Sequence, residues 1–142
     1  MMHACRRLLW IDCAAGALVG AATLGTLGWL SELYLLPREQ VLLIGGANLT
    51  YAAYSFALAI RPRRPLALLV LLVLANATWA VLCARWAVLY ADTASAFGLA
   101  HLVAEAVIVG GLAAAEWRCR GVLRTAGAAT GTGGRPGRPP SP

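Results

Sequence analysis

The sequence contains no lysine and few acidic residues. Of its 142 residues, 12 are basic, all of them arginine, and 6 are acidic, so charged residues make up 13% of the chain and the net charge is +6. A soluble domain has about 25% charged and roughly 45–50% apolar residues, whereas this chain is 60% apolar. A disordered chain would need low hydrophobicity. These figures exclude most soluble proteins. The positive charge is compatible with binding to nucleic acid, with binding to a membrane surface, or with loops on the cytoplasmic face of a membrane.

Recognisable catalytic and metal-binding motifs are also absent. The chain has no Walker loop, HExxH or GxSxG segment, and its four cysteines include no CxxC pair. Besides His101, the only histidine is His3, so a bis-histidine haem is not expected. We therefore expect no cofactor and no metal, and nothing in the sequence specifically supports an enzyme.

Long apolar runs, in contrast, fill most of the chain. They cover about residues 8–30, 41–60, 66–90 and 96–117. A helix needs about 20 apolar residues to cross a bilayer, and within hydrocarbon only helices and closed barrels satisfy their backbone groups. The runs are continuous rather than alternating, which excludes a barrel. The sequence predicts an all-α protein, a four-transmembrane-helix antiparallel bundle within residues 1–120.

The two ends of the chain differ from each other. The first apolar run is longer than the roughly 7–15 residues typical of a signal-peptide core, so we expect a retained helix. Residues 121–142 are rich in Gly, Pro and Arg and poor in apolar side chains. Such a composition cannot bury enough surface to fold, and we predict a disordered tail.

Arginine placement predicts the orientation. Ten of the twelve arginines lie before the first run, between the second and third, or after the fourth. Short loops rich in arginine stay in the cytoplasm. We therefore predict a multi-pass protein of the bacterial plasma (inner) membrane with both termini cytoplasmic. The lipid bilayer is then the expected partner, and the basic charge requires no nucleic acid.

Small residues mark the predicted helix-packing surfaces. Gly16 and Gly20 form a GxxxG pattern in the first run, and Ala106 and Gly110 are spaced by four in the last. Small residues let helices approach closely in lipid. Packing within one chain is favoured, while a homo-oligomer or another membrane-protein partner stays open. The short link 61–65 also predicts that the second and third runs are close neighbours.

Polar residues inside the runs are the candidate functional residues. Asn48 and Asn76 each lie in an A-N-x-T-aromatic-A segment. At 1.5 Å per residue, Asn48 lies roughly 4 Å from the centre of its helix, Asn76 within ~1 Å, and Glu105 roughly 2–3 Å from the centre of the last helix. We predict that they converge on one interior cluster with His101, which lies one turn from Glu105.

Two interpretations of this cluster stay open. Buried acids and histidines can carry protons in transporters, but a structural hydrogen bond that fixes helix packing is the favoured interpretation. Towards the inner end of the predicted spans, Asp12 is expected to pair with a nearby arginine, and Glu116 to be solvated.

Several short segments resemble small uncharacterised bacterial four-helix membrane proteins. These segments are Leu36-Pro37-Arg38 and residues 46–51, 97–102 and 116–118. The resemblance covers roughly residues 36–118 and implies no assigned activity, and the chain is also similar in size to DoxX-like proteins. We expect a structural or accessory membrane component. The alternative is a small proton- or cation-coupled transporter or channel that uses Glu105 and His101.

Overall fold

The computed structural model describes residues 2–61 and 64–125, with side chains from residue 7 to residue 124. Within these ranges the protein is all-α, with five helices and no strand. The helices are α1 (Met2–Gly25), α2 (Leu27–Tyr34), α3 (Arg38–Ala59), α4 (Leu66–Leu89) and α5 (Ala96–Thr125). All except the short α2 are long and apolar enough to cross a membrane. The predicted all-α class and its four apolar helices are therefore confirmed.

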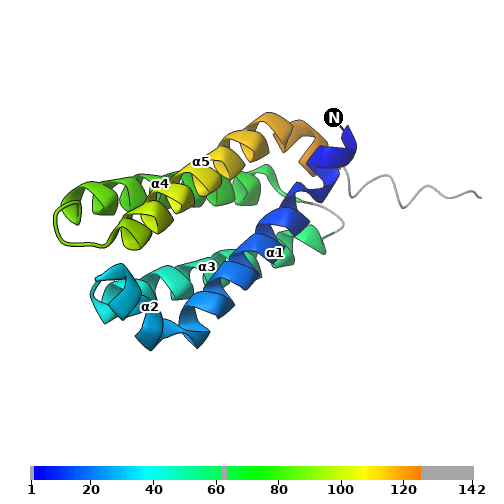
Figure 1. Cartoon of the computed structure of the whole chain (residues 1–142). Coiled ribbons are helices and arrows are strands. Elements are labelled where there is room, and N and C mark those ends of the chain that lie inside the picture. The colour runs from blue at the N-terminus through cyan, green and yellow to red at the C-terminus, as the bar shows by residue number, and fades with distance from the viewer. Residues whose placement is uncertain (1, 62–63, 126–142) are drawn as a thin grey trace, which may run out of the picture.

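The long helices pack as two pairs. α1 lies along α3, and α4 lies along α5 (Figure 1). α3 also contacts α4, because the hydroxyls of Tyr51 and Tyr54 donate to the carbonyl oxygens of Ala75 and Leu68 at 2.9 and 3.0 Å. The two sequential helices that the short link joins are therefore in contact, but each packs more extensively along another helix. α3 packs along α1 because the two helices present matching small residues to each other.

The approach of α1 to α3 is closest at three glycines. A Cβ added at Gly16 would lie 3.0 Å from the carbonyl oxygen of Asn48, and one at Gly20 would lie 2.9 Å from that of Gly45. The GxxxG pattern of α1 is therefore used within the chain. On α5, Gly110 is less crowded, because an added Cβ would meet its nearest neighbour, Ala80 on α4, at 3.5 Å. Ala106 packs against the apolar core.

The first predicted helix is broken in two at Thr26. The Thr26 hydroxyl donates a hydrogen bond to the carbonyl oxygen of Ala22, at 2.7 Å, and Gly25 and Gly28 flank the break. Threonine side chains that bond the preceding turn and glycines both weaken a helix locally. The following α2 ends at Leu35, whose backbone is left-handed with φ 53°.

The last helix continues beyond the predicted limit of residue 117, to Thr125. Residues 121–125, predicted as the start of the disordered tail, are therefore helical. Residues 126–142 lie outside the described part of the chain, so disorder there stays a prediction.

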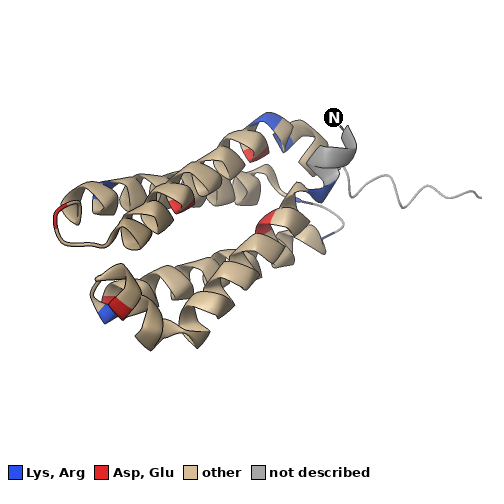
Figure 2. Ribbon diagram, in the orientation of Figure 1, with Lys and Arg blue, Asp and Glu red and all other residues tan. Residues whose placement is uncertain are grey.

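Two apolar core clusters hold the molecule, one near each end. One cluster contains Leu58, Leu72 and Leu123, at the end where α1 begins and α5 finishes. Arginines gather at this end (Figure 2), which we call the arginine-rich end. The other cluster contains Ile44 and Leu102, towards the opposite end. The polar residues that form the candidate site lie between the two clusters.

At the arginine-rich end, Arg64 ties three helix-end carbonyls together. Its guanidinium donates to the carbonyl oxygens of Leu58 and Ala59, both at 2.8 Å, and to that of Leu123 at 3.3 Å. The C-terminal carbonyls of a helix lack partners within the helix, and a cation stabilises them. Arg64 therefore joins the end of α3 to the end of α5.

At the opposite end, α2 meets the start of α5. The amide of Ser95 donates to the carbonyl oxygen of Tyr34 at 2.9 Å, and the Ser95 hydroxyl donates to that of Leu33 at 2.6 Å. Gly98 lies so close to this turn that an added Cβ would come within 2.6 Å of the Tyr34 carbonyl oxygen. The two helix pairs are thus joined by polar contacts at both ends.

Candidate functional site

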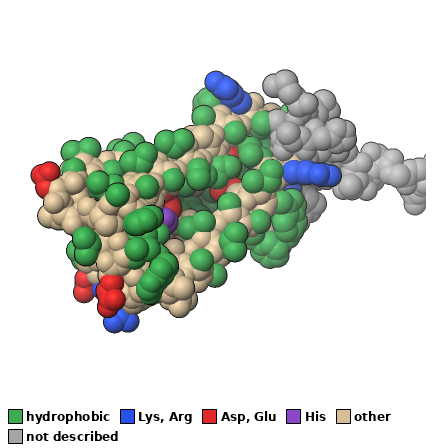
Figure 3. All heavy atoms as spheres, viewed as in Figure 1, with side chains coloured by type: hydrophobic (Ala, Val, Ile, Leu, Met, Phe, Trp, Pro, Cys, Tyr) green, Lys and Arg blue, Asp and Glu red, His purple; other side chains and the backbone are tan. Residues whose placement is uncertain are grey.

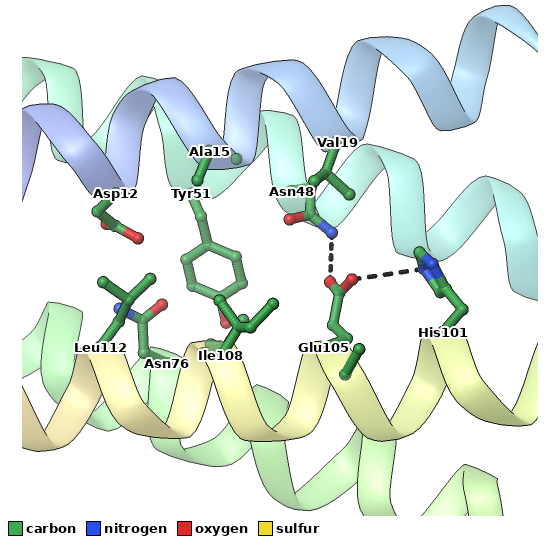
Figure 4. A pocket seen from close by; sticks show the side chains of 13 residues that line it. Asp12, Ala15, Val19, Asn48, Tyr51, Asn76, His101, Glu105, Ile108 and Leu112 are labelled. Atoms are coloured by element: carbon green, nitrogen blue, oxygen red, sulfur yellow. Dashed lines mark hydrogen bonds and ion pairs between the residues drawn. The ribbon is translucent and has the colours of Figure 1, made fainter.

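A cavity of about 140 Å³ lies between the two helix pairs, midway along them. All four long helices contribute to its lining, and Figure 4 shows its side chains at close range. Most of the wall is apolar, and its polar members are Asp12, Asn48, Tyr51, Asn76, His101 and Glu105. In Figure 3 the purple histidine and acidic side chains are visible inside a hollow framed by hydrophobic side chains. The cavity therefore reaches the molecular surface.

Glu105 is the most highly connected residue of the site. It is only 7% exposed. Its Oε1 accepts hydrogen bonds from the side-chain amide of Asn48 at 2.5 Å and from the indole N–H of Trp79 at 2.9 Å. Its Oε2 lies 3.4 Å from Nε2 of His101. Burying a carboxylate is costly unless donors compensate, and these groups, from α3, α4 and α5 itself, supply that compensation.

His101 faces Glu105 with one ring nitrogen and Tyr34 with the other. Its Nδ1 lies 3.4 Å from the Tyr34 hydroxyl, and the two rings are 5.1 Å apart. Burial, and secondarily the charge of Glu105, raise the pKa of Tyr34 above its ordinary value. The tyrosine therefore stays a neutral hydroxyl over a wide pH range and can serve as a hydrogen-bond donor or acceptor to the imidazole.

Asn76 lines the same cavity but bonds a different acid. Its side-chain amide donates to Oε2 of Glu116 at 3.1 Å, so three of the four predicted cluster residues are linked directly and Asn76 is linked elsewhere. Glu116 is only 2% exposed, and its Oε1 has no hydrogen-bond partner among the described residues. The expectation that Glu116 would be solvated was wrong, because α5 turns this side chain inward.

Asp12 is buried as well, at the part of the cavity nearer the arginine-rich end. Its carboxylate accepts a hydrogen bond from the hydroxyl of Ser55, which is fully buried on α3. We expected an arginine partner for Asp12. The structure instead supplies a neutral donor, which compensates part of the cost of burying the carboxyl group.

The repeated A-N-x-T segments have parallel roles in the structure. Each asparagine donates to a glutamate of α5, Asn48 to Glu105 and Asn76 to Glu116. The two glutamates are eleven residues apart, about three helical turns. The aromatic residues of the two segments also meet, since the rings of Tyr51 and Trp79 lie 6.2 Å apart.

Three partners of the site escaped the sequence analysis. Trp79 occupies the aromatic position of the second repeated segment, and Ser55 lies seven residues after Asn48 on the same face of α3. Both positions follow from helical spacing, which could have identified them. Tyr34 comes from the separate helix α2, and no periodicity in the sequence relates it to His101.

The arrangement can hold a charge or a proton, but it does not resemble a metal site. No group of three or more histidine, cysteine or acidic side chains could bind a metal ion within the described residues. No family model, curated protein or solved structure matches this chain.

Proposed function

We propose that this chain is a multi-pass membrane protein that forms an antiparallel four-helix bundle in a bacterial plasma membrane. The support is the large amount of apolar surface that the fold leaves uncovered. Bulky apolar side chains are two-thirds or more exposed on three of the long helices, at Leu18 (73%) on α1, Val81 (68%) and Val88 (76%) on α4, and Val107 (68%) on α5. Contiguous apolar surface of this kind marks a membrane or protein interaction site, and helix length favours the bilayer.

The proposed orientation places both termini in the cytoplasm. Of the eight arginines with described side chains, six lie at the arginine-rich end and only Arg38 and Arg85 lie towards the other (Figure 2). Positive charge stays on the cytoplasmic side. Cys119, near the arginine-rich end of α5, indicates the opposite orientation. It is disulfide-bonded, and disulfides persist mainly in oxidising compartments.

Reporter fusions decide between these two indications. A fluorescent protein fused after residue 142 should fluoresce, and alkaline phosphatase fused there should be inactive. A dark fluorescent fusion with an active phosphatase would reverse the orientation and place the disulfide outside the cytoplasm.

Within this framework we propose that the protein is a small proton- or cation-coupled transporter or channel that uses Glu105 and His101. The observation that carries the proposal is that Glu105 faces a cavity at mid-length of the helices. Ionisable residues inside a membrane are expensive and mark ion or proton pathways by default. A carboxyl group that served only helix packing would not require open space beside it.

Polar groups extend from Glu105 in both directions. Towards one end, His101 and Tyr34 follow. Towards the arginine-rich end, Asn76 and Asp12 line the same cavity, and Asn76 bonds Glu116. Chains of acids and histidines of this kind are a common form of proton relay in pumps and transporters.

Flux through reconstituted protein tests the proposal. Proteoliposomes containing the full chain and a trapped pH indicator should acidify when an inward proton gradient is imposed, alone or with a small cation. Glu105→Gln should abolish that flux, and Glu32→Gln, at an exposed glutamate of α2, should leave it unchanged. Absence of flux with the wild-type protein under both conditions would contradict a transport function.

A structural or accessory role is the second candidate, and one observation favours it. The carboxylate of Glu105 on α5 is bonded to side chains of α3 and α4, so it cross-links the two helix pairs. In that case wild-type liposomes show no flux, and Glu105→Ala lowers the denaturation temperature far more than Glu32→Ala does.

A further inference from the structure

The cavity beside Glu105 has the chemistry of a binding site for a small organic cation. Among the described residues that line it, the formal charges are acidic, from Glu105 and Asp12, and none is an arginine. His101 contributes a positive charge only when it is protonated. A cation therefore meets two carboxyl groups and no fixed positive charge among the residues that line the cavity.

The carboxylate of Glu105 has one oxygen left for a ligand. Oε1 already accepts two hydrogen bonds, from Asn48 and Trp79. Among the residues that the structure describes, Oε2 contacts Nε2 of His101, and this distance of 3.4 Å is long for a charge-assisted hydrogen bond. An ammonium group bound at Oε2 would gain a close partner without displacing either donor on Oε1.

The remainder of the wall favours an apolar body attached to that charge. Ala15 and Val19 of α1 lie opposite Ile108 and Leu112 of α5 (Figure 4). At about 140 Å³ the space is close to the ~150 Å³ cavity that accepts benzene in another protein. A hydrated inorganic ion would leave these apolar walls without partners, whereas a single ring or a few methyl groups would cover them.

The position of the opening suggests how such a ligand would enter. The hollow seen in Figure 3 lies on the side of the molecule, and exposed Ile108 lines the cavity there. In a bilayer this side faces lipid, so an amphipathic cation dissolved in the membrane would reach Glu105 without crossing the bundle ends.

From these features we propose that the cavity binds a small monovalent organic cation of the benzylammonium class at the carboxylate of Glu105. The ammonium group pairs with Oε2 of the carboxylate without any covalent bond being made or broken. The inference rests on the proposed function and names its substrate class.

Calorimetry with benzylammonium chloride tests the inference on the full chain in detergent micelles. We expect saturable binding. Neutral benzyl alcohol, of nearly the same shape, should bind about tenfold more weakly or worse, because it lacks the charge. Tetraphenylphosphonium should not bind because it is too large for the cavity.

Two variants distinguish the contribution of the Glu105 charge from that of the open volume of the cavity. Glu105→Gln removes the charge but keeps an acceptor for Asn48 and Trp79, and it should abolish benzylammonium binding. Ala15→Leu fills the cavity from α1 while the carboxyl group stays, and it should also abolish binding. Glu32→Gln is the matched control and should bind as the wild type does. Circular dichroism and gel filtration verify that each variant folds.

The outcomes separate this inference from the function on which it rests. Benzylammonium binding no tighter than benzyl alcohol, or unchanged in Glu105→Gln, would overturn the inference even if proton flux depends on Glu105. Binding that depends on Glu105 without any flux in liposomes would sustain the cation site and refute transport.

Discussion

The side-chain amide of Asn48 donates a hydrogen bond of 2.5 Å to Oε1 of Glu105, and this bond joins α3 to α5 across the space between the helix pairs. Both residues are buried. A hydrogen bond with an ionised partner is about twice as strong as a neutral one, so this contact is a principal link between the two halves of the molecule.

Asn48→Leu should lower the free energy of unfolding by about 1–3 kcal/mol, because a buried carboxylate loses one of its donors. The measurement is denaturant unfolding in detergent micelles. Thr50→Val is the matched control, since the exposed Thr50 hydroxyl bonds only the Gly46 carbonyl of its own helix. Equal effects of the two substitutions would show that the Asn48 contact adds no stability.

Gly20→Ala should destabilise the protein by about 1–3 kcal/mol, because the added methyl group would press against the Gly45 backbone and force α1 away from α3. Gly111→Ala should instead stabilise it by up to about 1 kcal/mol, since nothing lies within 4 Å of its added Cβ and alanine favours a helix. Thermal unfolding of both variants tests the pair. Destabilisation by Gly111→Ala would place a partner helix on that face of α5.

Arg64→Lys should lower stability by about 1–2 kcal/mol, because a lysine ammonium group cannot span the three carbonyl oxygens that the guanidinium reaches. Arg61→Lys, at an exposed neighbouring position, should be neutral. Chemical denaturation compares the two. If Arg61→Lys were the more damaging substitution, the helix-end role assigned to Arg64 would be incorrect.

Alkaline pH should destabilise the protein through Tyr34. The pKa of Tyr34 is raised in the folded state, so above pH 10 the unfolded chain loses this proton while the folded chain keeps it. Stability from this group is therefore complete below about pH 10 and is lost as pH rises through the folded pKa. Thermal unfolding between pH 8 and 11 should show a shallower decline for Tyr34→Phe than for the wild type. An identical decline would exclude a contribution from Tyr34.

The sequence was sufficient for the features that depend on composition and helical spacing. Four apolar runs predicted four long helices, and counting residues along them placed Asn48 and Glu105 at one level. The sequence was not sufficient to predict the rotation of each helix about its own axis or the hydrogen-bond partner of each polar side chain. Asn76 bonds Glu116 rather than Glu105 because the rotation of α4 about its own axis depends on packing with α5. Thr26 broke the first run through a local hydrogen bond that a hydropathy pattern does not record.

The pairing of the helices has a consequence for how the chain is assembled. α1 and α3 are complete, with their glycine contact, before α4 is synthesised, and α4 and α5 form the second unit. Each is a local helical hairpin, and contacts between segments close in sequence form fastest. Within the first hairpin, the Asn48 amide bonds only the Ile44 carbonyl of its own helix, and Asp12 accepts its hydrogen bond from Ser55. Glu105 already meets Trp79 and His101 within the second hairpin, and it gains the Asn48 amide of α3 only when the two hairpins dock.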